Sequence, residues 1–355
     1  MEQAGQSFII DTPAPIVDLE VVEQNIIRLQ RKCDQAGVSN RPHIKTHKSI
    51  EIAKLQMKHG ARGIACQKLG EAEIMAAGGI EDILISYNII GEAKHNRLAA
   101  LNDRFDLKVA CDNIIVAQGL SRAVSQCDKD LSVLVECDTG RHRCGVFTPQ
   151  AVAELAAEIE ALPRLHFAGL LTYAPNGPVT ETAEFVRMAR AECDARSISF
   201  DIVSAGGTPN CSRIGECGET EYRAGTYVYN DRMMVDCGAA TLENCALIVH
   251  SLVVSAPESG RLIIDAGSKT LTSDLGGFDD FGILIDHPGA RIVKFAEEHG
   301  FVDVSQCAAP PQIGEIVRVL PNHVCPVVNL FDNLVTTKNG VPQGSLSIDA
   351  RGKVT

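Results

Sequence analysis

Two alternating spacings of apolar positions run through the first two thirds of the chain. The segment DLEVVEQNIIRLQRKCDQAG places Val22, Ile26 and Leu29 on one face, as an amphipathic helix does. Short apolar runs that are typical of buried strands follow, with amphipathic segments such as TPQAVAELAAEIEAL between most of them. The eight runs are RPHIKTH, GIACQ, ILISY, LKVACD, LSVLVECD, LHFAGLLTY, FDIVSAGG and YRAGTYVYND. Because parallel strands need helical crossovers and eight such units close a sheet, we predict an α/β fold, a (β/α)8 TIM barrel, over residues 18–234.

After residue 234 the pattern changes to strand-like runs separated by Gly, Pro and Asp. The clearest runs are CALIVHSLVVSA, RLIIDAG, EIVRVL and VCPVVNL, and one short helix is indicated at residues 293–299. The run SFIID precedes the first barrel helix and is therefore free to join these strands. We predict a second, mostly antiparallel β domain made of residues 1–17 together with 235–355.

The composition is that of an ordinary globular protein that has no broad basic surface. Of 355 residues, 45% are hydrophobic and 22% are charged, and the formal net charge is −12. Such a chain is poorly suited to nucleic acid or an anionic membrane, so neither is expected as a partner. The longest apolar stretch, residues 245–256, is interrupted by His250 and two serines, so we expect no membrane span.

The cysteine content favours reduced thiols. There are thirteen cysteines, an odd number, and no C-x-x-C pair occurs in this large chain. The first residues, MEQAGQSFIIDTPAP, lack the basic start and apolar core of a signal peptide. We therefore expect a cytoplasmic protein.

Polar residue types gather where the predicted strands end, which is the face where barrel enzymes place their active sites. Loops after the seventh and eighth barrel strands frequently bind phosphate. Here glycines would let backbone N–H groups approach an anion, and hydroxyls would add donors. The candidate residues in these two loops are Ser204, Gly206, Gly207, Thr208, Gly225, Thr226 and Tyr227. A plain strand-to-helix turn is the alternative for the first loop.

Lys45 is a candidate nucleophile. In RPHIKTHK, strand alternation would place His43, Lys45 and His47 on one face. An inward lysine on a barrel strand is costly unless it is used, and partial desolvation favours the neutral amine that Schiff-base chemistry requires. A solvated lysine at a strand end is the alternative on local grounds.

Two further strand ends carry candidate residues. Arg143, in ECDTGRHRCGV, is predicted to enter the barrel mouth, where it could pair with a phenolate oxygen. A salt bridge to Glu136 or Asp138 is an equally good interpretation of this arginine. Tyr173 ends the sixth strand.

The segment PNHVC of the second domain places His323 and Cys325 two residues apart, and therefore on one face if the chain is extended. An imidazole and a thiolate could form half of a zinc site whose open positions would make the metal catalytic. A buried cysteine beside a hydrogen-bonded histidine is the alternative.

Several motifs in order resemble the fold-type III family of pyridoxal-phosphate (PLP) enzymes, which have the alanine racemase N-terminal type of barrel. The branch is the one that contains D-threonine aldolase, D-serine dehydratase and 3-hydroxyaspartate-processing relatives. The matching motifs are RPHIKTHK, DTG-x-x-R-C-G, SAGGTP, RAGTYVYND, DAGSK and PNHVC, and the resemblance runs from Pro15 to Arg351.

The resemblance implies a role for each candidate. Lys45 would form the Schiff base with PLP, Arg143 would pair with the PLP phenolic oxygen and Tyr173 would line the cofactor plane. The two loops would hold the phosphate. His323 and Cys325 would hold a divalent ion, Zn²⁺ or Mn²⁺, and these two residues with Lys45 would be the catalytic set. A homodimer that acts on a small amino acid is the family expectation.

The implied activity is metal-assisted cleavage of β-hydroxy D-amino acids. Retro-aldol cleavage to glycine and an aldehyde, as in D-threonine aldolase, is the leading interpretation, because LLTYAPNGP and SAGGTPN look nearer to the aldolases. The alternative is dehydration of D-serine or 3-hydroxyaspartate to a keto acid and ammonia, because His-x-Cys is similar to the zinc-dependent dehydratases. A racemase is less well supported, since no tyrosine follows Tyr229 to act as a second base. A non-catalytic PLP carrier would have no use for the second domain.

Overall fold

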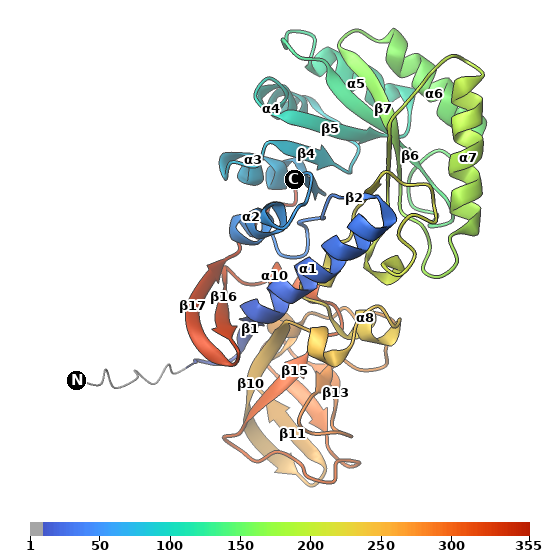
Figure 1. Ribbon diagram of the computed structural model, residues 1–355. Helices are drawn as coiled ribbons and strands as arrows, with labels where there is room; N and C mark the ends of the chain where they lie inside the picture. The colour runs from blue at the N-terminus through green and yellow to red at the C-terminus, as the bar shows by residue number, and fades with distance from the viewer. Residues whose placement is uncertain (1–9) are drawn as a thin grey trace. The chain divides into compact units, whose positions relative to one another are not determined.

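The computed structural model of the chain describes residues 10–355, which form two compact units (Figure 1). One unit, here the β unit, contains the residues up to Asn25 together with Val228–Arg351. The other, the barrel unit, contains Ile26–Tyr227 together with Gly352–Thr355. The long helix α1 (Leu19–Ala36) begins in the β unit and ends in the barrel unit.

The barrel unit is built on eight parallel strands. In sheet order these are β2 (Ser39–Asn40), β9 (Glu221–Tyr222), β8 (Ile202–Ala205), β7 (Leu165–Thr172), β6 (Leu131–Cys137), β5 (Asp106–Cys111), β4 (Asp82–Ile85) and β3 (Ile64–Cys66). The two ends of this order are also joined, because His43, just beyond β2, forms a parallel bridge with Ala65 of β3. The next residue, Ile44, donates its N–H to the Ala65 carbonyl at 2.9 Å. The sheet therefore closes, and the predicted TIM barrel is confirmed.

Helices alternate with the strands and lie around the outside of the sheet (Figure 1). They are α2 (Ile50–Lys58), α3 (Leu69–Ala77), α4 (Glu92–Asn102), α5 (Ile114–Ala123), α6 (Pro149–Ala161) and α7 (Thr180–Asp194). The N-cap of α6 illustrates the local cause: the Thr148 hydroxyl accepts the Ala151 N–H at 3.2 Å, and Pro149 supplies a first helical position that needs no donor.

The interior of the barrel is filled with side chains. One buried layer consists of Ala65, Leu84, Ala110, Leu134, Ala168, Leu171 and Ile202. At the amino ends of the strands, the fully buried Arg41 pairs with Glu221 and with Asp82, at 2.7 Å in each case. Removing one partner from such a buried group leaves an uncompensated charge, so this cluster has a structural role. Because this cluster occupies the amino ends of the strands, we expect an active site at the carboxyl ends, where barrel enzymes place theirs.

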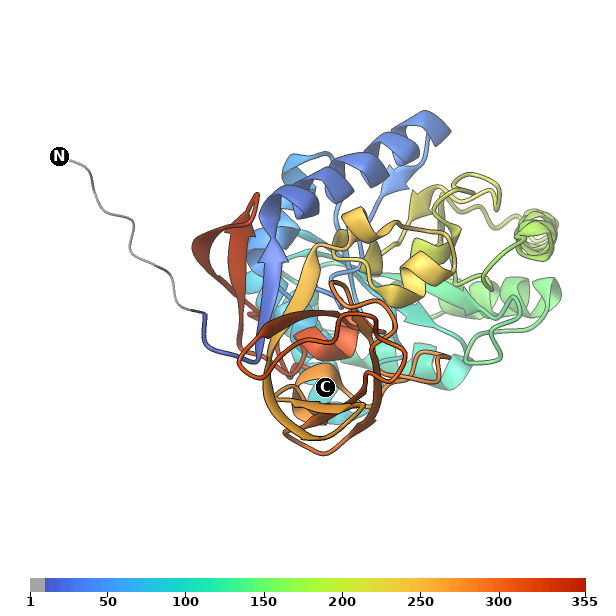
Figure 2. The same ribbon diagram turned by 90° about the horizontal axis from the view of Figure 1, so that it is seen from below.

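The β unit contains a nine-stranded sheet. In order the strands are β11 (Arg261–Ile264), β14 (Gly300–Asp303), β13 (Arg291–Phe295), β12 (Ile283–Leu284), β15 (Ile316–Leu320), β10 (Leu247–Glu258), β1 (Ala14–Asp18), β16 (Asn333–Lys338) and β17 (Val341–Ser347). Only the β1–β16 pair is parallel among the described strands of this sheet. Because β10 also pairs with β11, the sheet curls round on itself (Figure 2). The short helices are α8 (Arg232–Asp236), α9 (Ser268–Leu271) and α10 (Val324–Val328). The predicted antiparallel β domain is confirmed.

Several local predictions were wrong. The helix expected at residues 293–299 is strand β13, which pairs with β14. The run VCPVVNL, expected as a strand, is helix α10. The first barrel run, residues 41–47, follows the strand instead of forming it, because β2 ends at Asn40. Residues 44–47 form a turn, and Lys48 donates its N–H to the Ile44 carbonyl at 2.8 Å. Of the run SFIID, Ser7 to Ile9 lie outside the described residues, and the strand that joins the β sheet is β1.

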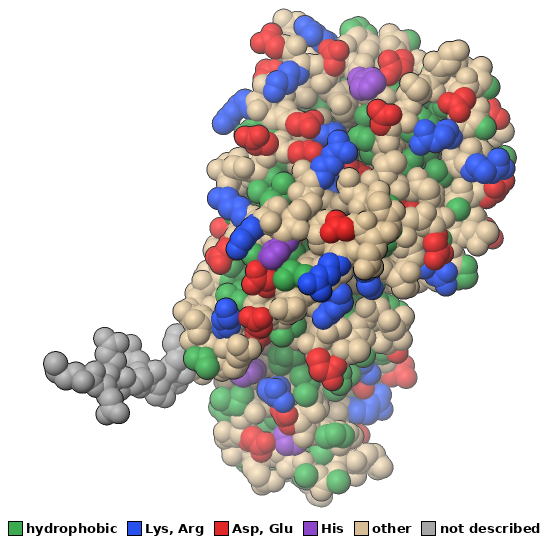
Figure 3. Space-filling model, viewed as in Figure 1, with side chains coloured by type: hydrophobic (Ala, Val, Ile, Leu, Met, Phe, Trp, Pro, Cys, Tyr) green, Lys and Arg blue, Asp and Glu red, His purple; other side chains and the backbone are tan. Residues whose placement is uncertain are grey.

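The surface and the thiols agree with the composition. Acidic and basic side chains are interspersed on the face shown in Figure 3, which carries no broad basic patch. All thirteen cysteines lie within residues 10–355, and none of them forms a disulfide there. Among the helices that the structure describes, none is both long enough and apolar enough to cross a membrane.

Candidate functional site

Lys45 lies in the turn that follows β2, and its side chain is exposed while His43 and His47 are buried. The alternation argument was therefore wrong: these three residues do not share the face of a strand. The buried Ile44 before it and Thr46 after it hold the turn in place. The turn presents the Lys45 amine to solvent.

His43 is hydrogen-bonded to this turn. The Lys45 N–H lies 3.3 Å from His43 Nδ1, and His43 Nε2 lies 3.2 Å from Ser86 Oγ and 3.3 Å from Gln67 Oε1. Burial lowers the pKa of His43 well below its usual value, and the charges of Lys45 and Arg223 lower it further. The imidazole is therefore neutral at physiological pH and acts as a hydrogen-bonding support.

Lys48, the next lysine in the motif, is engaged elsewhere. Its Nζ lies 2.7 Å from Glu71 Oε1, and both side chains are buried. Breaking a buried pair of this kind exposes a carboxylate to an apolar environment, which is costly. Of these two lysines, Lys45 is the one whose amine is available for covalent chemistry.

Arg143 is held at the mouth of the barrel by two acidic residues. The Asp138 carboxylate accepts the Arg143 N–H at 2.9 Å, and Arg143 Nη2 lies 3.3 Å from Glu136 Oε1. The ion pair with Glu136 that was considered from the sequence is thus present. Burial raises the pKa of Glu136, and Arg143 opposes that shift. The Arg143 side chain is half exposed, so this single ion pair contributes little to stability.

Tyr173 directly follows β7 and lies between the arginines and the glycine loop. The Arg141 guanidinium lies 4.2 Å from the centre of its ring and that of Arg143 lies 5.9 Å away. A Cβ atom at Gly207 would approach the Tyr173 ring to 2.4 Å. The ring therefore needs glycine at that position.

The end of β8 and the loop after it contain the residues predicted to bind a phosphate. Ser204 is fully buried, and its Oγ has no hydrogen-bond partner among residues 10–355. Gly206 has φ +94°, and a Cβ there would lie 2.1 Å from the Tyr222 ring. Glycine at this position is therefore required by the packing of the Tyr222 ring, and the buried Ser204 hydroxyl is left with an unmet hydrogen bond in the described part of the chain.

The second loop lies against the first. A Cβ at Gly225 would lie 2.9 Å from the His43 carbonyl oxygen. The Tyr227 N–H donates to Thr208 Oγ1 at 3.0 Å, and the Tyr227 hydroxyl accepts from Gln56 Nε2 at 2.9 Å. Thr226, between them, is partly exposed. The two predicted loops are thus brought together, with the hydroxyls of Thr208 and Tyr227 in structural hydrogen bonds.

Arg223 contacts the residues of these loops and was not singled out by the sequence reasoning. It is buried, its Nη2 donates to the Thr172 carbonyl at 2.6 Å and to the Ser204 carbonyl at 3.3 Å, and its Nε has no partner in the described part of the chain. Burial lowers its pKa to about 10. The only sequence signal was its place in the RAGTYVYND motif.

In the β unit, His323 and Cys325 lie at the start of α10, with His323 as the N-cap. They are not on one face of an extended segment, as was expected. Burial alone would lower the pKa of His323, but Cys325, Asp274 and Asp231 reverse this effect and raise it to about 9. The surroundings therefore stabilise positive charge on or next to this imidazole.

The donor set at this position is small. No group of three or more His, Cys, Asp and Glu side chains in residues 10–355 has an arrangement that could hold a metal ion. His323 and Cys325 supply two donors, an imidazole and a thiol, which suit Zn²⁺ and leave positions open. The electronegative surroundings and these donor types fit a divalent ion held at an open site.

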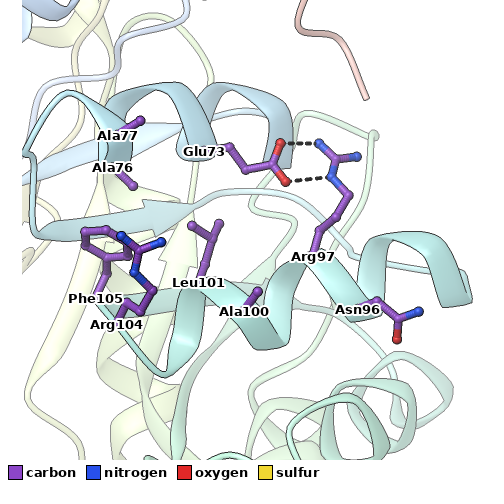
Figure 4. A pocket seen from close by; sticks show the side chains of 9 residues that line it. All are labelled: Glu73, Ala76, Ala77, Asn96, Arg97, Ala100, Leu101, Arg104 and Phe105. Atoms are coloured by element: carbon purple, nitrogen blue, oxygen red, sulfur yellow. Dashed lines mark hydrogen bonds and ion pairs between the residues drawn. The ribbon is translucent and has the colours of Figure 1, made fainter.

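A separate cavity of about 440 Å³ lies on the outside of the barrel unit, between α3 and α4 (Figure 4). Ala76, Ala77, Ala100 and Leu101 form its apolar part, and the Glu73–Arg97 ion pair closes one side. None of the predicted site residues lines it.

Comparisons with known proteins agree with the fold of both units. Residues 17–233 match the family described as "Alanine racemase, N-terminal domain", and residues 246–337 match the "Putative serine dehydratase domain". A D-threonine aldolase from Arthrobacter sp. is 37% identical over 97% of this chain and 93% of its own length.

Solved structures give the same picture. The crystal structure of a D-threonine aldolase from Filomicrobium marinum superposes with a TM-score of 0.88 at 30% identity, covering 98% of this chain and 97% of that one. A cysteine-to-alanine variant of D-threo-3-hydroxyaspartate dehydratase, in its metal-free form, gives a TM-score of 0.85 at 28% identity, covering 95% and 97%.

Proposed function

This chain belongs to the fold-type III family of PLP-dependent lyases, with an alanine racemase N-terminal barrel, and from that membership we propose that it cleaves β-hydroxy D-amino acids with the help of a divalent metal. The proposed reaction is retro-aldol cleavage, in which D-threonine gives glycine and an aldehyde. The observation that carries the metal-assisted reaction is the pair His323 and Cys325, placed among carboxylates at the start of α10.

The barrel residues would hold PLP. The Lys45 amine would bind the cofactor covalently, the loops at Ser204–Thr208 and Gly225–Tyr227 would hold the phosphate, and Tyr173 would line the ring. Arg143 would pair with the phenolic oxygen, competing with its ion pair to Glu136. When bound, PLP supplies an electron sink that allows a bond at the substrate Cα to break.

The other steps of the proposed reaction would be carried out by side chains of this protein. In retro-aldol cleavage the β-hydroxyl loses its proton to a base as the aldehyde forms, and Lys45 would return a proton to Cα from its ammonium form. In the dehydration alternative the neutral Lys45 amine would instead remove the Cα proton. His323 and Cys325 would hold the divalent ion, which supplies stabilisation of negative charge on the substrate β-oxygen. A β-hydroxyl is therefore required of the substrate, which explains the substrate class.

Dehydration is the second candidate function, and a specific observation favours it. The ligand pair here is His-x-Cys, and the dehydratase structure in its metal-free form carries a replaced cysteine. A thiolate favours Zn²⁺ over harder ions. The same site would then eliminate the β-hydroxyl, giving a keto acid and ammonia.

The test separates the two reactions by their products. Purified protein loaded with PLP and either Mn²⁺ or Zn²⁺ is incubated with D-threonine and D-serine, with L-threonine as the stereochemical control. We expect glycine and aldehyde from D-threonine and neither from the L enantiomer. Ammonia and keto acid as the main products would replace the aldolase proposal by the dehydratase one, and no turnover of either substrate would refute both.

The phosphate loop makes a further prediction. Gly207→Val would drive a side chain into the Tyr173 ring, and Thr208→Val would leave the buried Tyr227 N–H without an acceptor. We expect both changes to raise the Kd for PLP about tenfold or more, with a much smaller effect on turnover at saturating PLP.

Thr220→Val is the matched control for this prediction. The Thr220 hydroxyl also accepts a buried backbone N–H, that of Val203 at 2.9 Å, but it precedes β9 and so lies away from the mouth. Its loss should cost stability and leave the affinity for PLP unchanged. Equal PLP affinities in all three variants and in the unmodified protein would remove these loops from the phosphate site.

We further propose a cytoplasmic homodimer, since the family resemblance favours a dimer and thirteen cysteines without a disulfide suit a reducing compartment.

A further inference from the structure

A carboxylate that the sequence analysis did not single out lies against His323. Asp274 Oδ2 is 2.6 Å from His323 Nδ1, although the two residues are 49 positions apart in the chain. A carboxylate accepts hydrogen bonds, so the ring nitrogen that faces it must carry the hydrogen. His323 is thereby held in one tautomer, with the Nε2 lone pair left for a ligand.

The Asp274 carboxylate is itself fixed by the loop that carries it. The Gly276 N–H donates to Asp274 Oδ1 at 3.0 Å, and the Asp274 N–H donates to Thr272 Oγ1 at 3.0 Å. Asn322, next to His323, donates to the Leu275 carbonyl at 3.0 Å. The loop and the histidine segment are therefore tied together independently of the carboxylate–imidazole contact.

The segment that carries His323 and Cys325 has an anchor of its own. Buried Asp231 accepts the Val324 N–H at 3.0 Å through Oδ2 and the Met234 N–H at 3.0 Å through Oδ1. The first turn of α10 is thus held in place whether or not Asp274 is present. Loss of the Asp274 carboxylate would change the orientation and basicity of the His323 ring while the backbone stays where it is.

We propose that Asp274 is a positioning residue for the divalent metal, which fixes the His323 tautomer so that Nε2 binds the ion. Carboxylate–histidine–metal arrangements orient the ring and raise its basicity, and losing the carboxylate typically weakens metal binding 10- to 100-fold. The inference rests on the proposed function, which assigns His323 and Cys325 as the metal ligands.

The test measures metal affinity directly. Holoprotein loaded with PLP is titrated with Zn²⁺ in competition with a chelator, for the unmodified protein, Asp274→Ala and Asp274→Asn. We expect the Kd for Zn²⁺ to rise by about 10- to 100-fold in Asp274→Ala. Asp274→Asn should lose less, because its amide oxygen can still accept the Nδ1 hydrogen although it lacks the charge.

A second readout follows the tautomer. In protein labelled with ¹⁵N-histidine, the His323 signals are assigned from their absence in His323→Gln. At a pH high enough for the His323 ring to be neutral, metal-free unmodified protein and Asp274→Asn should show Nδ1–H, and Asp274→Ala should show increased Nε2–H. A purely structural role for Asp274 would not produce this difference between the two variants.

The control is Glu315→Gln. Glu315 makes the same kind of contact in the same unit, with Oε1 at 3.0 Å from His287 Nε2, but that histidine has no neighbouring cysteine ligand. The Glu315→Gln protein should bind Zn²⁺ with the same Kd as the unmodified protein. If Asp274→Ala and Asp274→Asn bind Zn²⁺ as tightly as the unmodified protein, the positioning role is wrong and the metal site stands. If the unmodified protein binds no Zn²⁺ or Mn²⁺ at micromolar concentration, the proposed metal site fails and the inference fails with it.

Discussion

Lys45→Ala is expected to abolish the visible absorbance of the PLP-loaded protein and to lower turnover by on the order of 10²- to 10⁴-fold. The absorbance depends on a covalent link between PLP and a lysine, and turnover depends on an amine that moves a proton at the substrate Cα. Lys45 is exposed in its turn, whereas Lys48 is held in a buried ion pair with Glu71. The Lys45 amine is therefore accessible and that of Lys48 is engaged, and attachment of the cofactor to Lys45 stays a prediction.

The measurement for Lys45 combines absorbance with mapping of the attachment site. Borohydride reduction followed by peptide mass spectrometry should find the cofactor on Lys45. Lys54→Ala, which removes an exposed lysine from α2, should retain both colour and turnover. Recovery of the cofactor on Lys48 or Lys269 would show that the site has been misplaced.

Removal of the metal is expected to stop turnover without loss of colour. The residues proposed to hold PLP belong to the barrel unit and those proposed to hold the ion belong to the β unit, so each set can be emptied separately. A chelator should therefore lower the rate with D-threonine while the visible absorbance persists. A metal-free preparation that works at full rate would refute the metal-assisted reaction and return PNHVC to a structural role.

Replacement of Cys325 sharpens this prediction. Cys325→Ala should lower turnover by on the order of 10²-fold or more with any metal, because a single protein ligand cannot hold the ion well and its charge stabilisation is worth several kcal/mol. Cys325→Asp exchanges a soft thiolate for a hard carboxylate, so we expect preference to move from Zn²⁺ towards Mn²⁺ or Mg²⁺. Rates with each metal, measured on variants of unchanged thermal stability, provide the check.

The architecture was accessible from the sequence because it follows from hydrophobic spacing. Runs such as LSVLVECD and LHFAGLLTY became the buried strands β6 and β7, and TPQAVAELAAEIEAL became α6 with Thr148 as its cap. Spacing of this kind reports burial on one face, which is a local property that each segment carries by itself.

Local predictions failed where a short segment is compatible with two structures. VCPVVNL is rich in β-branched residues, yet Asp231 accepts the Val324 N–H and fixes the first turn of helix α10. The stretch around Val293 became β13 because β14 pairs with it. In both cases a partner that is distant in the chain overrides local propensity.

The same cause limits what the sequence could say about the site. The motifs located Lys45 and the two glycine loops. Arg223 and Asp274 become candidates only in the structure, where Arg223 contacts the Ser204 carbonyl and Asp274 contacts His323. No spacing links Asp274 to His323 across the four strands, β12 to β15, that lie between them in the chain. Residues that hold a functional side chain in position can thus be identified only from the structure. Residues that belong to a sequence motif can be identified from the sequence.

The pairing of β1 has a consequence for how the protein is made. Ala14 pairs with His250 of β10, and Ile16 pairs with Val335 of β16, so both neighbours of this early strand are synthesised after residues 26–227 of the barrel unit. A nascent chain therefore carries an apolar strand with two open edges until β10 has been made, and with one open edge until residues 333–338 have left the ribosome. Pairings this distant in the chain form slowly, and an open edge is where strands of other molecules add. We expect aggregation during biosynthesis to begin at β1, and refolding of the β unit to lag behind that of the barrel unit.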